Sequence, residues 1–259
     1  MVKYKIILQY DGTRLNGWQR QGNTENTVQG KLERLLSELA GQPVAVQGAS
    51  RTDAGVHAAA QVADFSLPQP YDCDYLLSYM NDRLPRDIAV QSVSPVSLRF
   101  HSRHSAHAKT YVYRIWNGPV RPVFDRQYQW YIPAGPQLRN GKITEIPPLD
   151  VNAMVQAAAD FTGTHDFGAF CTKRQAKKSS VRTVYEVTVG QDGPALRITF
   201  RGSGFLYNMV RIMVGTLVEI GAGERPANDI PRILAQGDRA AAGMTAPPCG
   251  LTLTDITYL

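Results

Sequence analysis

The chain has 259 residues, enough for one large domain or two small ones. Its 28 Lys and Arg residues outnumber its 22 Asp and Glu residues, and the net charge of +6 favours a polyanionic partner such as a nucleic acid. Cys73, Cys171 and Cys249 are odd in number and far apart, which argues against a disulfide framework or a zinc cluster and fits reduced thiols in a cytoplasm.

The first hundred residues alternate between strand and helix patterns. Apolar and polar residues alternate over the first nine positions after Met1, which indicates a strand, and no signal peptide is expected. Asn26 is a suitable N-cap for a following helix with a leucine-rich stripe. The β-α-β-β-α-β order predicts a ferredoxin-like unit. The expected strands cover 2–10, 44–47, 61–67 and 88–93, and the expected helices cover 26–39 and 72–82.

The second half repeats this element order without repeating the sequence. We therefore predict an α+β protein of two ferredoxin-like halves, with domains over 1–104 and 105–259 and antiparallel sheets that abut around a central cleft. The expected strands cover 108–116, 181–189, 195–200 and 251–258, and the expected helices cover 151–161 and 205–220.

Residues 48–58 form a loop of small residues between two strand patterns. Asp53 is its only carboxylate, and Arg51 lies two positions earlier. Small residues allow tight turns and a close approach of the backbone to a ligand. A lone acid before glycine is more often a solvated loop residue, so Asp53 becomes a catalytic candidate only if other parts of the chain agree.

Arg211 lies in the middle of an apolar segment, residues 205–218, that is too short to span a membrane. At helical spacing it shares a face with Tyr207, Asn208 and Gly215. A cation in such a segment must find a partner or extend its head to water, and periodicity alone leaves both open.

Tyr111 and Tyr113 point to one face of a predicted strand, where an aromatic ring near the acid could stack on an unpaired base or simply belong to the core. The stretch from Lys173 to Lys178 is strongly basic, and it could contact phosphates or be a solvated loop. His101, His104 and His107 precede a strand that would scatter them, so no metal site is expected. The basic candidates are Lys173, Arg174, Lys177 and Lys178.

The loop from Ser50 to His57 resembles the active-site loop of the TruA-type tRNA pseudouridine synthases, although Ser50 stands where that motif usually begins with glycine. Four other segments resemble motifs of the same family in the same order, with Leu15 and Cys249 as further departures. They are Tyr10 to Thr13 with Gly17 to Gln21, Lys109 to Tyr113, Gly204 to Arg211, and Pro247 to Leu251.

The resemblance implies that the protein isomerises uridine to pseudouridine at positions 38, 39 and 40 of the tRNA anticodon stem-loop. It further implies a cytoplasmic homodimer that needs no cofactor and has no membrane partner. Asp53 would be the catalytic carboxylate, acting as a nucleophile or as a base on the sugar, and Arg211 would pair with it and keep it ionised. Arg51 would help to displace or hold the target base, Tyr111 would contact it, and Leu251 would pack against it.

Two other functions fit the sequence. A non-catalytic RNA-binding protein of two sheet-faced units would explain the charge and the fold, but it would not explain an arginine in an apolar helix and a lone acid in a loop of small residues. A pseudouridine synthase that acts on another RNA would share every motif. The sequence does not separate this second alternative from the first interpretation.

Overall fold

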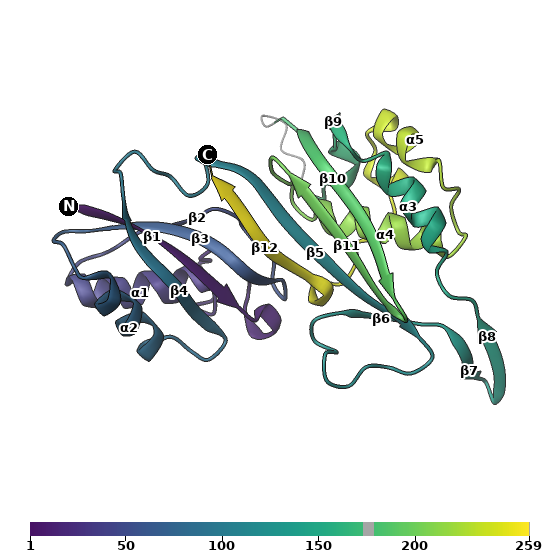
Figure 1. Cartoon of the computed structure of the whole chain (residues 1–259), viewed down its shortest axis with the longest axis horizontal. Helices are drawn as coiled ribbons and strands as arrows, with labels where there is room; N and C mark the ends of the chain where they lie inside the picture. Colours follow the sequence, from purple (N-terminus) through teal and green to yellow (C-terminus); the bar gives the residue numbers. More distant parts are fainter. Residues whose placement is uncertain (173–178, 259) are drawn as a thin grey trace. The chain divides into compact units, whose positions relative to one another are not determined.

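The computed structural model describes residues 1–172 and 179–258 (Figure 1). The chain forms two compact units, one of Met1–Lys109 with Thr252–Leu259 and one of Thr110–Leu251. The division predicted from the sequence lies between residues 104 and 105, and the return of the C-terminal strand to the first unit is not visible in the order of elements. Among the described residues, no helix has the length and apolar character needed to cross a membrane.

The first unit is a mainly antiparallel sheet with two helices. Strand β1 lies between β3 and β4, and β2 pairs with the part of β3 around Phe65, which gives the strand order of a ferredoxin-like unit. The C-terminal strand β12 runs parallel to β3, with Thr252 opposite His57. The elements are β1 (Val2–Tyr10), α1 (Val28–Ala40), β2 (Val46–Gly48), β3 (His57–Leu67), α2 (Cys73–Arg83), β4 (Ile88–Val96) and β12 (Leu251–Tyr258).

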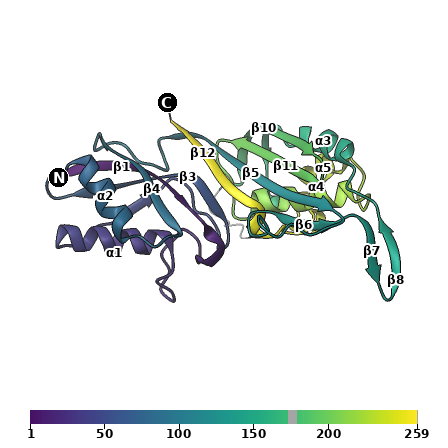
Figure 2. The same cartoon turned by 60° about the horizontal axis from the view of Figure 1, so that its bottom comes forward.

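The core of this unit lies between the sheet and its helices. Alternate residues of β1, from Tyr4 to Tyr10, are buried, as the period of a half-buried strand requires. Helix α1 buries Leu32 and Leu36 from its apolar stripe. Figure 2 shows α1 and α2 along the same face of the sheet. The N-cap of α1 is Thr27, whose hydroxyl accepts from the N–H of Gly30, so the expected cap at Asn26 was wrong by one residue.

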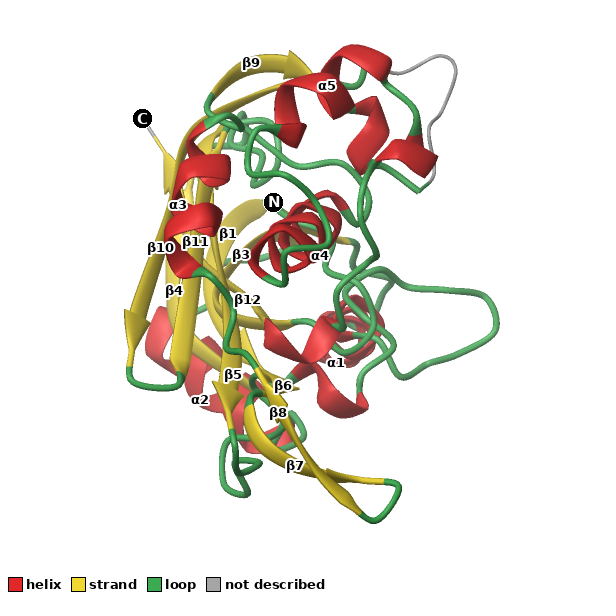
Figure 3. Ribbon diagram, turned by 90° about the vertical axis from the view of Figure 1, so that its right-hand side faces the viewer, coloured by secondary structure: helices red, strands yellow, loops and turns green. Residues whose placement is uncertain are grey.

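The second unit has a mainly antiparallel sheet in the order β5-β11-β10-β9, and β6 runs parallel to β5. Strands β7 and β8 form a separate hairpin. Figure 3 distinguishes the helices α3, α4 and α5 from these strands by colour. The elements are β5 (Ala106–Gly118), β6 (Trp130–Pro133), β7 (Gly135–Arg139), β8 (Lys142–Ile146), α3 (Val151–Ala159), β9 (Gly163–Asp166), β10 (Val181–Asp192), β11 (Ala195–Gly202), α4 (Met209–Gly221) and α5 (Asp229–Gln236).

The α+β class predicted from the sequence is confirmed. The helix predicted from residue 205 begins only at Met209, because Asn208 has a left-handed backbone with φ of 62° and ends the helical path towards the N-terminus. Strands β6 to β9 and helix α5 were not predicted. The strands lie in short or irregular apolar patterns, and α5 has only eight residues.

Candidate active site

Asp53 lies in the connection between β2 and β3 of the first unit. The side chains before it alternate, since Ser50 and Thr52 are buried while Arg51 is exposed and Asp53 is partly exposed. Two polar residues are therefore anchored inside the unit. The two charged residues predicted to act in the reaction lie on the accessible side of the loop.

The segment that follows β1 holds this loop in place. The backbone N–H of Trp18 donates to the carbonyl oxygen of Thr52 at 3.1 Å, and the N–H of Gly55 donates to the carbonyl oxygen of Leu15 at 3.4 Å. The hydroxyls of Tyr10 and Thr52 are 2.8 Å apart. The first sequence motif and the Asp53 loop thus form one hydrogen-bonded structure.

Buried polar side chains fix the other side of the loop. The amide of Gln61 on β3 bonds to both the N–H and the carbonyl oxygen of Ser50, and its Nε2 also donates to the Tyr10 hydroxyl. The Lys109 ammonium, which is 9% exposed, donates to the carbonyl oxygen of Ala49 at 2.6 Å. Because these donors and acceptors are shielded from water, the loop backbone has little freedom around Asp53.

Two glycines are required by close packing at the loop. A Cβ atom on Gly48 would lie 2.2 Å from the ring of the buried Trp18, and one on Gly17 would lie 2.7 Å from the carbonyl oxygen of Thr52. Gly17 also has φ of +86°, a conformation that glycine adopts readily. The small residues recognised in the sequence therefore allow backbone and ring to meet next to the candidate acid.

Arg211 lies in the first turn of α4 in the second unit. Its Nε donates to the carbonyl oxygen of Ala246 at 2.7 Å, and its Nη1 donates to Oδ1 of Asn208 at 3.0 Å. The backbone N–H of Ala246 returns a bond to the carbonyl oxygen of Arg211 at 3.1 Å. Most of α4 is buried, from Met209 to Gly221, so these contacts hold a cation at the edge of an apolar helix.

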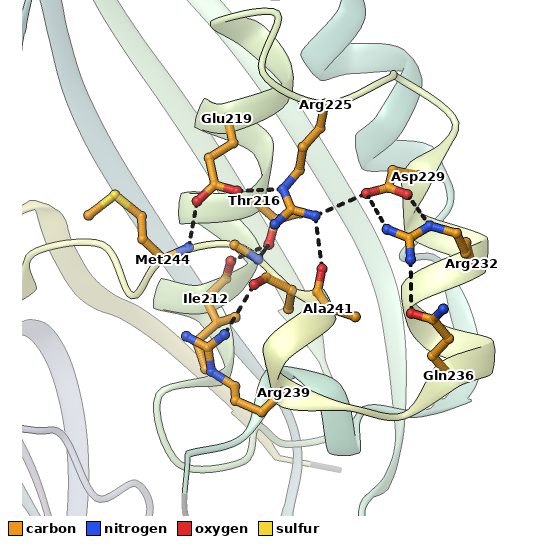
Figure 4. A network of polar contacts seen from close by, with 12 residues as sticks. Ile212, Thr216, Glu219, Arg225, Asp229, Arg232, Gln236, Arg239, Ala241 and Met244 are labelled. Carbon is orange, nitrogen blue, oxygen red and sulfur yellow. Dashed lines mark hydrogen bonds and ion pairs between the residues drawn. The ribbon is translucent and has the colours of Figure 1, made fainter.

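A polar network attaches the segment before Ala246 to α4 (Figure 4). The N–H of Gly243 donates to the Thr216 hydroxyl at 2.9 Å, and the N–H of Met244 donates to Oε1 of Glu219 at 2.7 Å. Arg225 binds Glu219 through Nε and donates to the carbonyl oxygen of Ala241 at 2.8 Å. These bonds fix the position of the segment that leads to Ala246, whose carbonyl oxygen accepts from Arg211.

Arg225 is in turn paired with Asp229, which is also held by Arg232 (Figure 4). The Arg232 guanidinium, with help from Arg225, lowers the pKa of the buried Asp229 carboxyl below its ordinary value. Burial opposes ionisation of Arg225, but its hydrogen bonds to Glu219 and Asp229 prevail and raise its pKa. Asp229 and the two arginines that hold it are therefore charged at neutral pH.

The two tyrosines of β5, Tyr111 and Tyr113, are both buried in the second unit. Tyr113 is fully buried, its hydroxyl donates to the carbonyl oxygen of Pro247 at 2.7 Å, and burial raises its pKa. The ring of Tyr111 is 6% exposed and meets Phe205 edge to face at 5.3 Å. Leu251, at the start of β12, is 5% exposed. Tyr113 is therefore a core residue, which is one of the two roles that the sequence left open.

The structure thus places the predicted site residues in two groups. Asp53 and Arg51 share one loop of the first unit, and the second unit carries Arg211, Tyr111 and Leu251. The pairing of Asp53 with Arg211 stays a prediction. The four predicted phosphate-contacting residues lie outside the described part of the chain, namely Lys173, Arg174, Lys177 and Lys178.

Several residues that hold these groups were not selected from the sequence. Gln61 sits in a strand pattern and gives no signal of its own, since buried glutamines are uncommon and their partners are distant in sequence. Asn208 offered a weak signal, because at helical spacing it shares a face with Arg211. Ala246 acts through its backbone, which a sequence does not reveal.

Comparison with known proteins gives a consistent result over the whole chain. The profile of a family described as tRNA pseudouridine synthase matches residues 6–105 and 157–259. A protein from Bacillus sp. (strain KSM-64) named tRNA pseudouridine synthase A is 43% identical over 258 residues, with 100% of each chain covered. Proteins of the same name from Brevibacillus brevis and Halalkalibacterium halodurans are each 41% identical, the first covering 100% of both chains and the second covering 97% of this chain and 90% of the relative.

Proposed function

Because the chain belongs to the tRNA pseudouridine synthase family, we propose that it isomerises uridine to pseudouridine at positions 38, 39 and 40 of the tRNA anticodon stem-loop. The observation that carries this proposal is the loop that presents Asp53. It is a single carboxylate, partly exposed, on a backbone held by bonds from three separate segments. A reacting group needs a backbone that is held in one position, whereas a residue in a solvated loop does not need one.

The reaction moves a glycosidic bond within one nucleotide. The bond between N1 of uracil and C1′ of ribose breaks, the base rotates, C5 bonds to C1′, and the proton on C5 is lost as N1 gains one. Asp53 either attacks C1′ or removes a proton from the sugar, and both routes need an ionised carboxylate. No electrons enter or leave the substrate, so the chemistry itself calls for no redox cofactor.

The remaining candidates prepare the substrate. A paired uridine must leave the helical stack before a side chain can reach its ribose, which costs a few kcal/mol. Arg51 is exposed beside Asp53 and would displace or hold the base. Arg211 would pair with Asp53 and fix its orientation, and Tyr111 and Leu251 would contact the base.

The substrate would be recognised mainly through its shape and phosphates, since base edges in an RNA duplex are poorly accessible. The net charge of +6 favours such a partner. The four basic residues would contribute phosphate contacts, namely Lys173, Arg174, Lys177 and Lys178. We further propose that the protein works in the cytoplasm as a homodimer, with one tRNA touching both subunits.

The test is the Asp53→Asn variant assayed with tRNA labelled with tritium at C5 of uridine. Asparagine has nearly the shape of aspartate but cannot act as nucleophile or base, so tritium release should stop while tRNA affinity stays close to that of the original chain. Asp192→Asn, at the exposed end of β10, is the matched control and should retain activity. Turnover by Asp53→Asn would refute the role of the acid.

A second experiment identifies the substrate. Pseudouridine is mapped in the tRNA and other RNAs of a strain that lacks the gene. Loss of pseudouridine at the three anticodon stem-loop positions supports the proposal. Loss in another RNA with intact tRNA would assign a different substrate, and no loss in any RNA would favour a binding protein without this activity.

A further inference from the structure

Asn208, directly before α4, has an unusual backbone. Its φ is 62°, and it shares positive φ with only one other non-glycine residue in the described chain, Asn140. Asparagine tolerates this left-handed conformation better than most residues, but glycine adopts it more readily. The fold thus keeps a side chain where glycine would be easier to accommodate, which raises the question of what that side chain does.

The Asn208 side chain does not cap its helix. Asparagine is among the strongest N-cap residues because its oxygen can accept from an N–H of the first turn, yet α4 has no such bond. Instead Oδ1 accepts from Nη1 of Arg211 at 3.0 Å, and Nδ2 donates to the hydroxyl of Thr172 at 2.9 Å. Both ends of the amide make contacts beyond the helix backbone, and one of the two contacted groups is the guanidinium of Arg211.

Asn208 and Ala246 together set the orientation of Arg211. They accept from Nη1 and Nε respectively, and two bonds to different nitrogens define the plane of a rigid guanidinium. Both acceptors are neutral, one an amide oxygen and the other a backbone carbonyl. They therefore orient the cation without neutralising its charge.

We propose that Asn208 is a positioning residue, which acts on the reaction through Arg211. It presents the guanidinium to the reacting carboxylate in one orientation and so preserves the aligned ion pair that the isomerisation needs. This inference rests on the proposed function, in which Arg211 pairs with Asp53. The guanidinium only donates, so it faces the amide oxygen of Asn208, and the Thr172 hydroxyl accepts from the amide nitrogen at the other end.

Asn208→Gly is the first test, because glycine keeps the left-handed backbone and removes only the amide. We expect kcat for tritium release from tRNA to fall about ten-fold or more, as small misplacements of a catalytic group do. The KM for tRNA and the urea midpoint of unfolding should change little. Asn140→Gly, at the other left-handed asparagine, is the matched control and should leave kcat unchanged.

Asn208→Asp is the second test and separates positioning from folding. The carboxylate keeps the acceptor and the side-chain volume but places a negative charge against Nη1 of Arg211, so it competes for the cation. We expect kcat to fall at least ten-fold while the urea midpoint stays equal or rises, because the new ion pair favours the folded state.

The outcomes are distinct. Wild-type kcat in both variants overturns the inference. A fall in Asn208→Gly that accompanies a lower urea midpoint, with normal kcat in Asn208→Asp, also overturns it and assigns a purely structural role. If the original chain releases no tritium from tRNA, the proposed function fails instead, which is a different result from an active original chain with unaffected variants.

Discussion

Gln61 and Ser50 are joined by two hydrogen bonds of opposite direction. The N–H of Ser50 donates to Oε1 of Gln61 at 3.1 Å, and Nε2 of Gln61 donates to the carbonyl oxygen of Ser50 at 2.7 Å. Gln61 is 0% exposed, so water does not compete for these bonds. One side chain on β3 therefore pairs with the backbone three residues before Asp53, much as a neighbouring strand would.

Replacing Gln61 with leucine should destabilise the protein and slow the reaction. The change leaves the N–H and carbonyl oxygen of Ser50 buried without this partner, which we expect to lower the free energy of unfolding by about 2–3 kcal/mol. The loop would also lose its fixed position, so kcat should fall about ten-fold. Urea unfolding and tritium release from tRNA measure the two effects.

Gln91→Leu is the control for this prediction, because Gln91 lies exposed on β4, where its side chain bonds to that of Gln9. The same chemical change there should alter the free energy of unfolding by less than about 0.5 kcal/mol. Equal effects of the two substitutions would show that Gln61 has no special part in holding the loop.

Much of the fold could be predicted because the periodic signals were strong. The alternation along β1 and the leucine stripe of α1 each match the observed elements closely. The early start predicted for the α4 helix has a local cause, since Phe205 and Leu206 continue its apolar pattern but Asn208 adopts a conformation that no helix contains. Helix α5 is only eight residues long, shorter than the segments that a periodic pattern identifies as helices.

The candidate site was less accessible to such reasoning. Asp53 and Arg211 could be selected because the motifs around them resemble those of a known family, and because a cation in an apolar helix is in itself unusual. The residues that support them could not be selected in this way, because Gln61 binds backbone atoms and Ala246 acts through a backbone atom of its own. A sequence identifies side chains that break a pattern, but it does not say which backbone atoms they meet.

Arg211→Lys should lower kcat while the protein remains folded. A lysine keeps the positive charge, but its single ammonium cannot reproduce the bonds that Nε and Nη1 make to Ala246 and Asn208. The cation would then be poorly oriented, and we expect kcat to fall about a hundred-fold. Arg197→Lys, on the exposed side of β11, should be silent in the same tritium assay. An Arg211→Lys variant with normal kcat would mean that charge alone suffices.

Asp229→Asn should destabilise the second unit. Asp229 is 5% exposed and bonds to both Arg225 and Arg232, so the amide would leave Arg232 without this carboxylate and Arg225 with Glu219 but not Asp229. We expect a loss of about 3 kcal/mol in the free energy of unfolding at neutral pH. Asp82→Asn breaks the exposed pair with Arg83 and should cost less than about 1 kcal/mol.

The effect of Asp229→Asn should depend on pH in a defined direction. Arg232 and Arg225 lower the folded-state pKa of Asp229 below its ordinary value of 3.8. The stabilisation is therefore fully present above about pH 3.8 and is lost as the pH falls through the folded-state value. The difference between the original chain and the variant should stay constant from about pH 7 to pH 5 and shrink below pH 3.8. A difference that grows on acidification would contradict the assignment of this ion pair.

Cys249 should react slowly with alkylating reagents in the folded protein. Burial raises the pKa of its thiol, and its Sγ lies 3.7 Å from the carbonyl oxygen of Gln129, to which it donates. Since the thiolate is the reactive form, each unit of raised pKa lowers the rate at neutral pH about ten-fold. Mass spectrometry after timed exposure to iodoacetamide would give the rate at Cys249, with the same cysteine in the urea-unfolded chain as reference. We expect the folded rate to be slower than the unfolded rate and to rise with pH. Equal rates in the folded and unfolded chains would mean that the thiol is neither shielded nor raised in pKa by its surroundings.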